Sequence, residues 1–140
     1  MSTTPSDRIS VSAKIDKSLA RVWELYTAPE HITNWNAASP EWHCPSAEND
    51  LRTGGHFSSR MEARDGSMGF DFGGTYTAVK QQESLAYTMD DGRACEVRFS
   101  KNGDATRVDV AFDSDNANPV EMQRGGWQAI LGNFKKYVEG

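Results

Sequence analysis

The sequence predicts an α+β domain in which a curved antiparallel sheet of about six to seven strands wraps around one long C-terminal helix. Apolar and polar residues alternate near the N-terminus and again in successive segments between residues 56 and 112, which is the period of half-buried strands. The last twenty or so residues change to the period of an amphipathic helix. Because a sheet with one apolar face needs a cover, this helix is expected to pack against it.

A strand and a helix are predicted at the N-terminal end of the chain. Residues 9–15 alternate apolar and polar side chains, as in a half-buried strand. Asp16 and Ser18 then offer N-caps, since their side-chain oxygens can accept the free amide hydrogens of a first helical turn. The helix that follows has one apolar face, made of Leu19, Val22, Trp23 and Tyr26.

A second short helix is expected directly afterwards. Thr27 and Glu30 have the spacing of a capping box, and Pro29 suits the first turn. Ile32 and Trp35 would form the buried side of this helix. Residues 36–54 then have the composition of a loop, with one short edge strand expected near Ala47–Asp50.

The middle of the chain predicts a meander of antiparallel strands joined by tight turns. Asp65-Gly66, Asp91-Gly92 and Asn102-Gly103 mark three of these turns, because two-residue hairpin loops require a positive φ angle. One face of the strands is apolar throughout. A twisted sheet that curls around a single helix diverges from it over part of its length, so a cavity is expected between them.

The C-terminal helix is predicted to extend from about Pro119 to Tyr137. Asn118 is expected as the N-cap, Pro119 as the first helical residue and Glu121 as the third. The apolar stripe that would face the sheet consists of Met122, Trp127, Ile130, Leu131, Phe134 and Val138.

Length and charge narrow the class of protein. A chain of 140 residues fits one domain, residues 1–140 with a core of about 9–139, and is long enough to be stable without disulfides or metal. Its net charge of −5 and the absence of any Lys/Arg run predict no binding to nucleic acid. The polar N-terminus and the lack of a long apolar window predict no membrane association and a cytoplasmic location.

The two cysteines, Cys44 and Cys95, are expected to be free thiols in a chain without a signal peptide. His43 and Cys44, together with His56 or His31, would be the candidate metal ligands. Their spacing matches no metal-binding pattern, so neither a metal nor another cofactor is expected.

Five segments in order resemble the START/Bet v 1-like (SRPBCC) superfamily, and more closely its group of Hsp90-ATPase-activator homologues. They are Ser18–Trp35 (SLARVWELYTAPEHITNW), Asp50–Phe57 (DLRTGGHF), Phe70–Tyr76 (FDFGGTY), Leu85–Thr88 (LAYT) and Gly126–Val138 (GWQAILGNFKKYV). The resemblance runs over about residues 9–139 and implies a helix-grip fold. It also implies a range of functions, since this superfamily includes lipid carriers, polyketide cyclases and dehydratases, and a co-chaperone domain.

The leading hypothesis is a non-enzymatic domain that binds a small apolar molecule in its cavity. The aromatic and methionine side chains expected to line the cavity are Trp35, Trp42, Phe57, Met61, Phe70, Phe72, Tyr76, Tyr87 and Trp127. Such side chains pack irregularly and leave gaps that a ligand can occupy. Tyr76, Tyr87 and the Trp127 indole are the expected hydrogen-bond donors to it.

Two alternatives stay open. One is an enzyme of cyclase, dehydratase or hydrolase type acting on a hydrophobic substrate, with His56, Tyr76 or Tyr87 as the acid or base. The other is a co-chaperone-like protein-interaction module. The co-chaperone of the resembling group carries an N-terminal docking domain for which this chain has no room, so we expect no Hsp90 activation by the chain alone. The sequence also leaves open whether the chain forms a homodimer.

Overall fold

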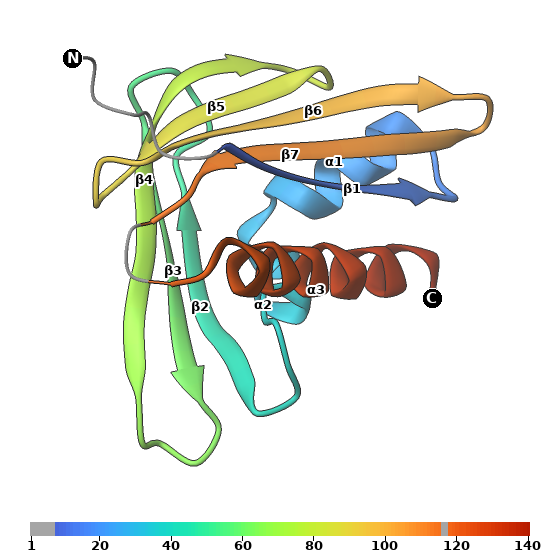
Figure 1. The fold of residues 1–140 in the computed structure, drawn as a ribbon. Helices are drawn as coiled ribbons and strands as arrows, with labels where there is room; N and C mark the ends of the chain where they lie inside the picture. Colours follow the sequence, from blue (N-terminus) through green and yellow to red (C-terminus); the bar gives the residue numbers. More distant parts are fainter. Residues whose placement is uncertain (1–7, 116–117) are drawn as a thin grey trace.

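The computed structural model describes residues 8–115 and 118–140, which form a seven-stranded antiparallel sheet and three helices (Figure 1). In chain order the elements are β1 (Arg8–Ile15), α1 (Leu19–Thr27), α2 (Pro29–Trp35), β2 (Trp42–Asn49), β3 (His56–Ala63), β4 (Gly69–Lys80), β5 (Ser84–Met89), β6 (Ala94–Asn102), β7 (Ala105–Asp113) and α3 (Val120–Glu139). The predicted fold class is therefore confirmed.

The sheet has the strand order β1-β7-β6-β5-β4-β3-β2, so β1 and β2 form its two edges. It is strongly curved. In Figure 1, β5, β6, β7 and β1 run across the top of the molecule, whereas β2, β3 and β4 run downward, and α3 lies in the angle between these two groups. The bend falls within β4, where the pairing with β5 shifts register between Tyr76 and Ala78. Such a bulge increases local twist and bends a strand.

The predicted turns of the meander are present. Gly66, Gly92 and Gly103 have φ angles of 79°, 95° and 65°. These values lie in the left-handed region that glycine adopts without steric penalty. The apolar faces of the strands are buried as their alternation predicts. For example, Cys95, Val97 and Phe99 of β6 are all buried.

The start of α1 agrees with the prediction, but the start of α2 does not. The Ser18 hydroxyl accepts a hydrogen bond from the Arg21 amide at 3.3 Å, which makes Ser18 the N-cap of α1. The predicted capping box of Thr27 and Glu30 is wrong, because α1 extends through Thr27, whose hydroxyl donates to the Trp23 carbonyl at 2.8 Å. Ala28 is the N-cap of α2 and has no side-chain hydrogen bond.

The sequence underestimates β2. A short strand near Ala47–Asp50 was expected inside a loop, but β2 has eight residues and begins at Trp42. Its alternation is obscured by Pro45 and by a register shift between His43 and Ser46. Both are tolerated because β2 is an edge strand that pairs with β3 alone, so a missing amide hydrogen on the other side breaks no ladder.

The predicted helix α3 is confirmed as one long helix, with two corrections at its start. Pro119 is the N-cap without a side-chain hydrogen bond, and the helix begins at Val120 rather than at Pro119. Met122 is 63% exposed and does not belong to the buried stripe, whereas Gln123 is buried. Because each residue advances about 100° around a helix, the face that contains Leu131, Phe134 and Val138 includes position 123 rather than 122.

The core joins the concave face of the sheet to all three helices. Phe134 of α3 lies at the centre, with its ring centroid 5.1 Å from that of Tyr26 in α1 and 4.9 Å from that of Trp35 in α2. The Trp35 indole N–H also donates to the Leu25 carbonyl at 2.9 Å, which fixes α2 against α1. Within residues 8–115 and 118–140, none of the helices is long and apolar enough to cross a membrane.

Two glycine substitutions are expected to change stability in opposite directions. A Cβ at Gly74 of β4 would lie 2.6 Å from the Thr88 carbonyl oxygen and 3.1 Å from the Phe57 ring. Gly74→Ala should therefore lower the free energy of unfolding by about 1–3 kcal/mol through overpacking. Gly132 lies inside α3, and a Cβ there meets no other described part of the chain within 4 Å. Gly132→Ala should raise stability by about 0.5–1 kcal/mol.

Urea unfolding of both variants measures the two changes. Gly132→Ala is the control for the general effect of adding a methyl group. If Gly74→Ala proved as stable as the wild type, the close approach of β4 to β5 and to Phe57 would not constrain the sheet.

Candidate functional site

A pocket of about 310 Å³ lies between the concave face of the sheet and the helices. Its walls come from all three helices and from strands β2 to β5 and β7. Phe70 is 50% exposed and Glu48 is exposed, so these lining residues mark where the pocket opens to solvent. The pocket lies at the bend of the sheet, where the strands diverge from α3. Its volume is at the small end of the range of ligand sites in proteins, about 300–1,000 Å³.

Eight of the nine predicted site residues line this one pocket: Trp35, Phe57, Met61, Phe70, Phe72, Tyr76, Tyr87 and Trp127. They come from α2, β3, β4, β5 and α3, so the fold brings together residues up to 92 positions apart in the chain (35 to 127). Trp42 does not join them. It lines a separate hollow between the loop after α2, the start of β2 and the outer side of α3.

The aromatic side chains of the pocket contact one another in edge-to-face and tilted arrangements. Phe57 is central to this wall, with its ring centroid 4.7 Å from that of Tyr87, 5.2 Å from that of Tyr76 and 5.9 Å from that of Phe72. On the opposite wall Trp127 stacks on Phe112 at 3.9 Å and meets Phe72 edge-on. Edge-to-face contacts fix the orientation of each ring. The wall is therefore apolar and ordered.

Two hydrogen bonds through Asn49 link the C-terminal end of β2 to its neighbours. The Tyr76 hydroxyl donates to the Asn49 side-chain oxygen at 2.7 Å, and the Asn49 amide nitrogen donates to the Thr27 carbonyl at 2.7 Å. These bonds connect β4, β2 and the end of α1. Because the donor of Tyr76 is already engaged, this hydroxyl is less available to a ligand than the sequence suggested.

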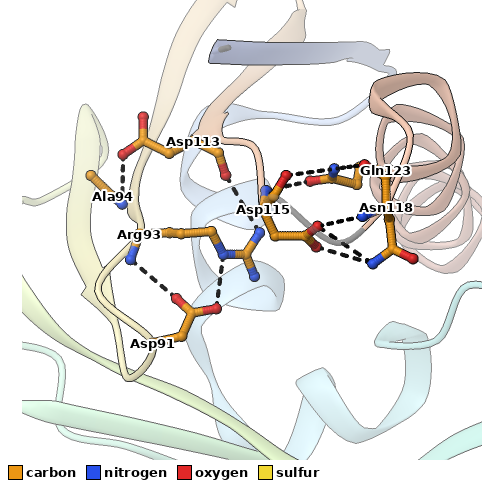
Figure 2. Close-up of polar contacts among 7 residues, drawn as sticks. All are labelled: Asp91, Arg93, Ala94, Asp113, Asp115, Asn118 and Gln123. Atoms are coloured by element: carbon orange, nitrogen blue, oxygen red, sulfur yellow. Dashed lines mark hydrogen bonds and ion pairs between the residues drawn. The ribbon is translucent and has the colours of Figure 1, made fainter. Parts of the chain in front are cut away.

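A second polar network surrounds Arg93, which lines the pocket from the turn before β6 (Figure 2). Its guanidinium donates to the Asp91 carboxylate at 2.8 Å and to the Asp113 carbonyl at 3.4 Å. The Asp113 carboxylate in turn accepts from the Ala94 amide at 3.0 Å and pairs with Arg8 at 3.2 Å. Arg93 is thus a cation held at the pocket with part of its hydrogen-bonding capacity engaged.

A further group of hydrogen bonds lies between the end of β7 and the first turn of α3 (Figure 2). The buried Gln123 side chain accepts from the Asp115 amide at 2.8 Å and donates to the Asn118 carbonyl at 2.8 Å. The Asn118 amide donates to the Asp115 carboxylate at 2.9 Å. Gln123 therefore fixes the start of α3 relative to the end of β7, while Pro119, and not Asn118 as expected, is the N-cap and makes no side-chain hydrogen bond.

Burial raises the pKa of the three tyrosines that line the pocket and of the cysteine beside them. It raises the pKa of Tyr76 to about 12, partly offset by the bond to Asn49. It raises the pKa of the Tyr26 and Tyr87 hydroxyls well above their ordinary value. Cys95 and Tyr76 make smaller contributions at both hydroxyls, and Tyr26 makes one at Tyr87. The buried Cys95 thiol behind Tyr87 has a pKa of about 12 for the same reason. These groups are therefore protonated, neutral donors at physiological pH.

The expected acid and base candidates differ in position. His56 faces outward as predicted, with 54% of its side chain exposed and its ring nitrogen 3.2 Å from the Asp90 carboxylate. Tyr76 and Tyr87 line the pocket. The candidate metal ligands His31, His43, Cys44 and His56 do not converge, and the described residues contain no group of three or more ligands that could hold a metal. Cys44 and Cys95 are both buried and unlinked.

Comparison with known proteins decides the family. The model of the family described as Activator of Hsp90 ATPase homolog 1-like protein matches residues 16–139. The chain belongs to this family. The predicted resemblance to the Hsp90-ATPase-activator homologues of the SRPBCC superfamily is therefore confirmed, while none of the curated proteins compared with the chain matches it.

Solved structures of similar proteins agree closely with this fold. The AHSA1-like protein from Aeromonas hydrophila is 43% identical, has a TM-score of 0.90, and the match covers 95% of this chain and 92% of that one. Protein Chr148 from Cytophaga hutchinsonii is 46% identical, with a TM-score of 0.82 and coverage of 94% and 92%. Protein CV1439 from Chromobacterium violaceum is 21% identical, with a TM-score of 0.85 and coverage of 96% and 99%, and shows the shared fold alone.

The sequence did not single out Tyr26, Asn49 or Arg93 as residues of the AHSA1-like pocket. Tyr26 has the helical spacing of a core residue, and that spacing cannot distinguish a packed ring from a ring whose hydroxyl reaches a pocket. Asn49 lies in the segment expected to be mostly loop. Arg93 follows the Asp91-Gly92 turn signal, which predicts the turn but not the direction of the next side chain.

Proposed function

We propose that this AHSA1-like protein binds a small, mostly apolar molecule in the pocket between the sheet and α3. The observation that carries the proposal is the convergence of eight aromatic and methionine side chains, far apart in sequence, on one pocket of about 310 Å³. Ligand sites are typically concave and apolar, with few polar groups that fix orientation. Here those groups are the tyrosine hydroxyls, Asn36, Asn49, Ser59, Glu48 and Arg93.

The state of the polar groups supports binding rather than base catalysis. A general base must be deprotonated near the working pH, but burial raises the pKa of Tyr26, Tyr76 and Tyr87. The His56 imidazole, the other candidate, faces away from the pocket. Arg93 is already paired with Asp91, so its charge is partly neutralised. The arrangement suits a neutral ligand that makes many apolar contacts and few hydrogen bonds.

A pocket-filling variant tests the proposal. Ile130 of α3 lines the pocket and is half-buried, so Ile130→Trp should place an indole in the space a ligand would occupy. Binding of 2-ethylnaphthalene and of medium-chain fatty acids is measured by amide chemical-shift titration. The wild type should bind at least one probe with a Kd below about 1 mM, and Ile130→Trp should weaken it by ~10-fold or more.

Met122→Trp is the matched control, because Met122 lies on the same helix, is 63% exposed and does not line the pocket. It should bind as the wild type does. If no probe shifted pocket amides at about 1 mM, or if Ile130→Trp bound as tightly as Met122→Trp, the proposed function would be wrong. Native mass spectrometry of freshly purified protein would then show whether any small molecule is retained.

A further inference from the structure

The position of Tyr26 in the pocket is unusually well defined. Its ring stacks on Trp35 at 5.1 Å and meets Phe99 at 5.3 Å and Phe134 at 5.1 Å edge-on. These three contacts come from α2, β6 and α3, while Tyr26 itself belongs to α1. Four elements therefore fix one ring, and the direction of its hydroxyl is set by the fold rather than by a hydrogen bond.

The Tyr26 hydroxyl has no hydrogen-bond partner among the described residues, unlike the other two tyrosines of the pocket. Tyr76 donates to Asn49, and the Tyr87 hydroxyl interacts with the Cys95 thiol. The described residues contain no fully enclosed side-chain nitrogen or oxygen without a partner. The Tyr26 oxygen must therefore lie against the open space of the pocket that its residue lines.

Two other hydrogen-bond donors that line the pocket differ from the Tyr26 hydroxyl in their surroundings. The Trp127 indole N–H and the side-chain amide of Asn36 also have no hydrogen-bond partner among residues 8–115 and 118–140, but Asn36 lines a second, surface hollow as well. Trp127 is held by stacking on Phe112, with one ring beside its edge. Tyr26 is the donor whose ring is surrounded by aromatic residues on three sides, where an unpaired hydroxyl is most unfavourable.

The surroundings of Tyr26 also define which acceptor it suits. Burial, followed by the nearby Cys95 and Tyr76, raises its pKa, so the group is a neutral O–H donor. The same low-polarity environment disfavours an anion beside it. A neutral oxygen acceptor would satisfy the hydroxyl without bringing a charge into the pocket.

On this geometry we propose that the Tyr26 hydroxyl is a specificity-determining group that selects ligands with a neutral carbonyl oxygen on an otherwise apolar, aromatic-sized skeleton. The inference rests on the proposed function, because it names the ligand class of the same pocket. A ligand without such an oxygen leaves the donor unpaired, whereas a ketone or quinone of the same shape pairs it. The Tyr26 hydroxyl distinguishes the two ligands mainly because an unpaired buried hydroxyl is unfavourable, and less because its hydrogen bond to the carbonyl is strong.

A matched pair of probes tests the inference. 2-Acetylnaphthalene carries a carbonyl where 2-ethylnaphthalene carries a methylene group, and 2-naphthoate adds a charge. Tyr26→Phe should raise the Kd of the ketone by about 3- to 10-fold and change the Kd of the hydrocarbon by less than about 2-fold. Tyr137→Phe is the control, since its hydroxyl bonds His31 at 2.7 Å outside the pocket. 2-Naphthoate should bind the wild type more weakly than the ketone does.

A spectroscopic measurement on the wild type keeps the test independent of the variant's folding. The carbonyl stretch of bound 2-acetylnaphthalene should lie at lower frequency than in hexane, as for a hydrogen-bonded ketone. A hexane-like frequency would overturn the inference, as would equal losses for both probes in Tyr26→Phe or tighter binding of 2-naphthoate. If the hydrocarbon bound and only the carbonyl preference were missing, the proposed function would stand without this inference. If neither naphthalene bound, this inference would fall, and the proposed function would fall with it if the fatty acids did not bind either.

Discussion

Raising the pH from 8 to 11 is expected to lower the free energy of unfolding by about 4 kcal/mol or more. The pKa values of Cys95 and Tyr76 are both about 12 in the folded protein, against ordinary values of 9.0 and 10.0. Between these limits the unfolded chain has released protons that the folded protein still holds. Stability is therefore fully present below pH 9 and is lost as the pH rises toward 12. Tyr26 and Tyr87 act in the same direction.

Urea unfolding at intervals of pH measures this loss directly. Cys95→Ser is the informative variant, because serine has nearly the same shape and does not titrate. Between pH 9 and 11 the free energy of unfolding of Cys95→Ser should fall less steeply than that of the wild type. The two slopes should differ by about 1.4 kcal/mol per pH unit. An unchanged slope in Cys95→Ser would mean that the thiol is not held protonated by burial.

Phe134→Ala is expected to destabilise the protein by about 3–5 kcal/mol. Phe134 is 0% exposed and contacts Tyr26 and Trp35, so its removal leaves a cavity where α1, α2 and α3 meet. Removing a buried aromatic ring loses the favourable free energy of its transfer out of water and also its packing contacts. The same residues hold the pocket wall, so the Tyr26 ring should also lose its fixed position.

Met122→Ala is the control on the same helix. Because Met122 is 63% exposed, its truncation should change the free energy of unfolding by no more than about 0.5 kcal/mol. A loss below about 1 kcal/mol for Phe134→Ala would show that α3 does not need this contact to pack against the other helices.

The pocket is a consequence of how the sheet bends. A twisted sheet with one apolar face must diverge from a straight helix along part of its length. Here β4 bends at the bulge between Tyr76 and Ala78, and Gly74 allows the close approach to β5 that the bend requires. The space that opens is lined by large rings, which fill it incompletely. The functional hypothesis therefore follows from the same residues that specify the fold.

Periodicity was sufficient for most of the elements and insufficient for the irregular ones. The strands from β3 to β7 and the helix α3 have clear repeats, because each has one face against the core. Strand β2 has none, since it is an edge strand with a proline and a register shift. The start of α3 was misplaced for a different reason. Its N-cap, Pro119, makes no side-chain hydrogen bond, and the segment before the helix is held instead by Gln123 from inside the helix.

What the sequence by itself determined is the fold, the family and most of the apolar pocket wall, because these depend on which face of each element is apolar. The tertiary structure alone decided the polar part of the site. Trp42 faces another hollow, Tyr76 is engaged by Asn49, and the hydroxyl of Tyr26 is left facing the pocket. Periodicity reports that a side chain is buried, but hydrogen-bond partners from distant segments decide whether its polar atom is satisfied or available to a ligand.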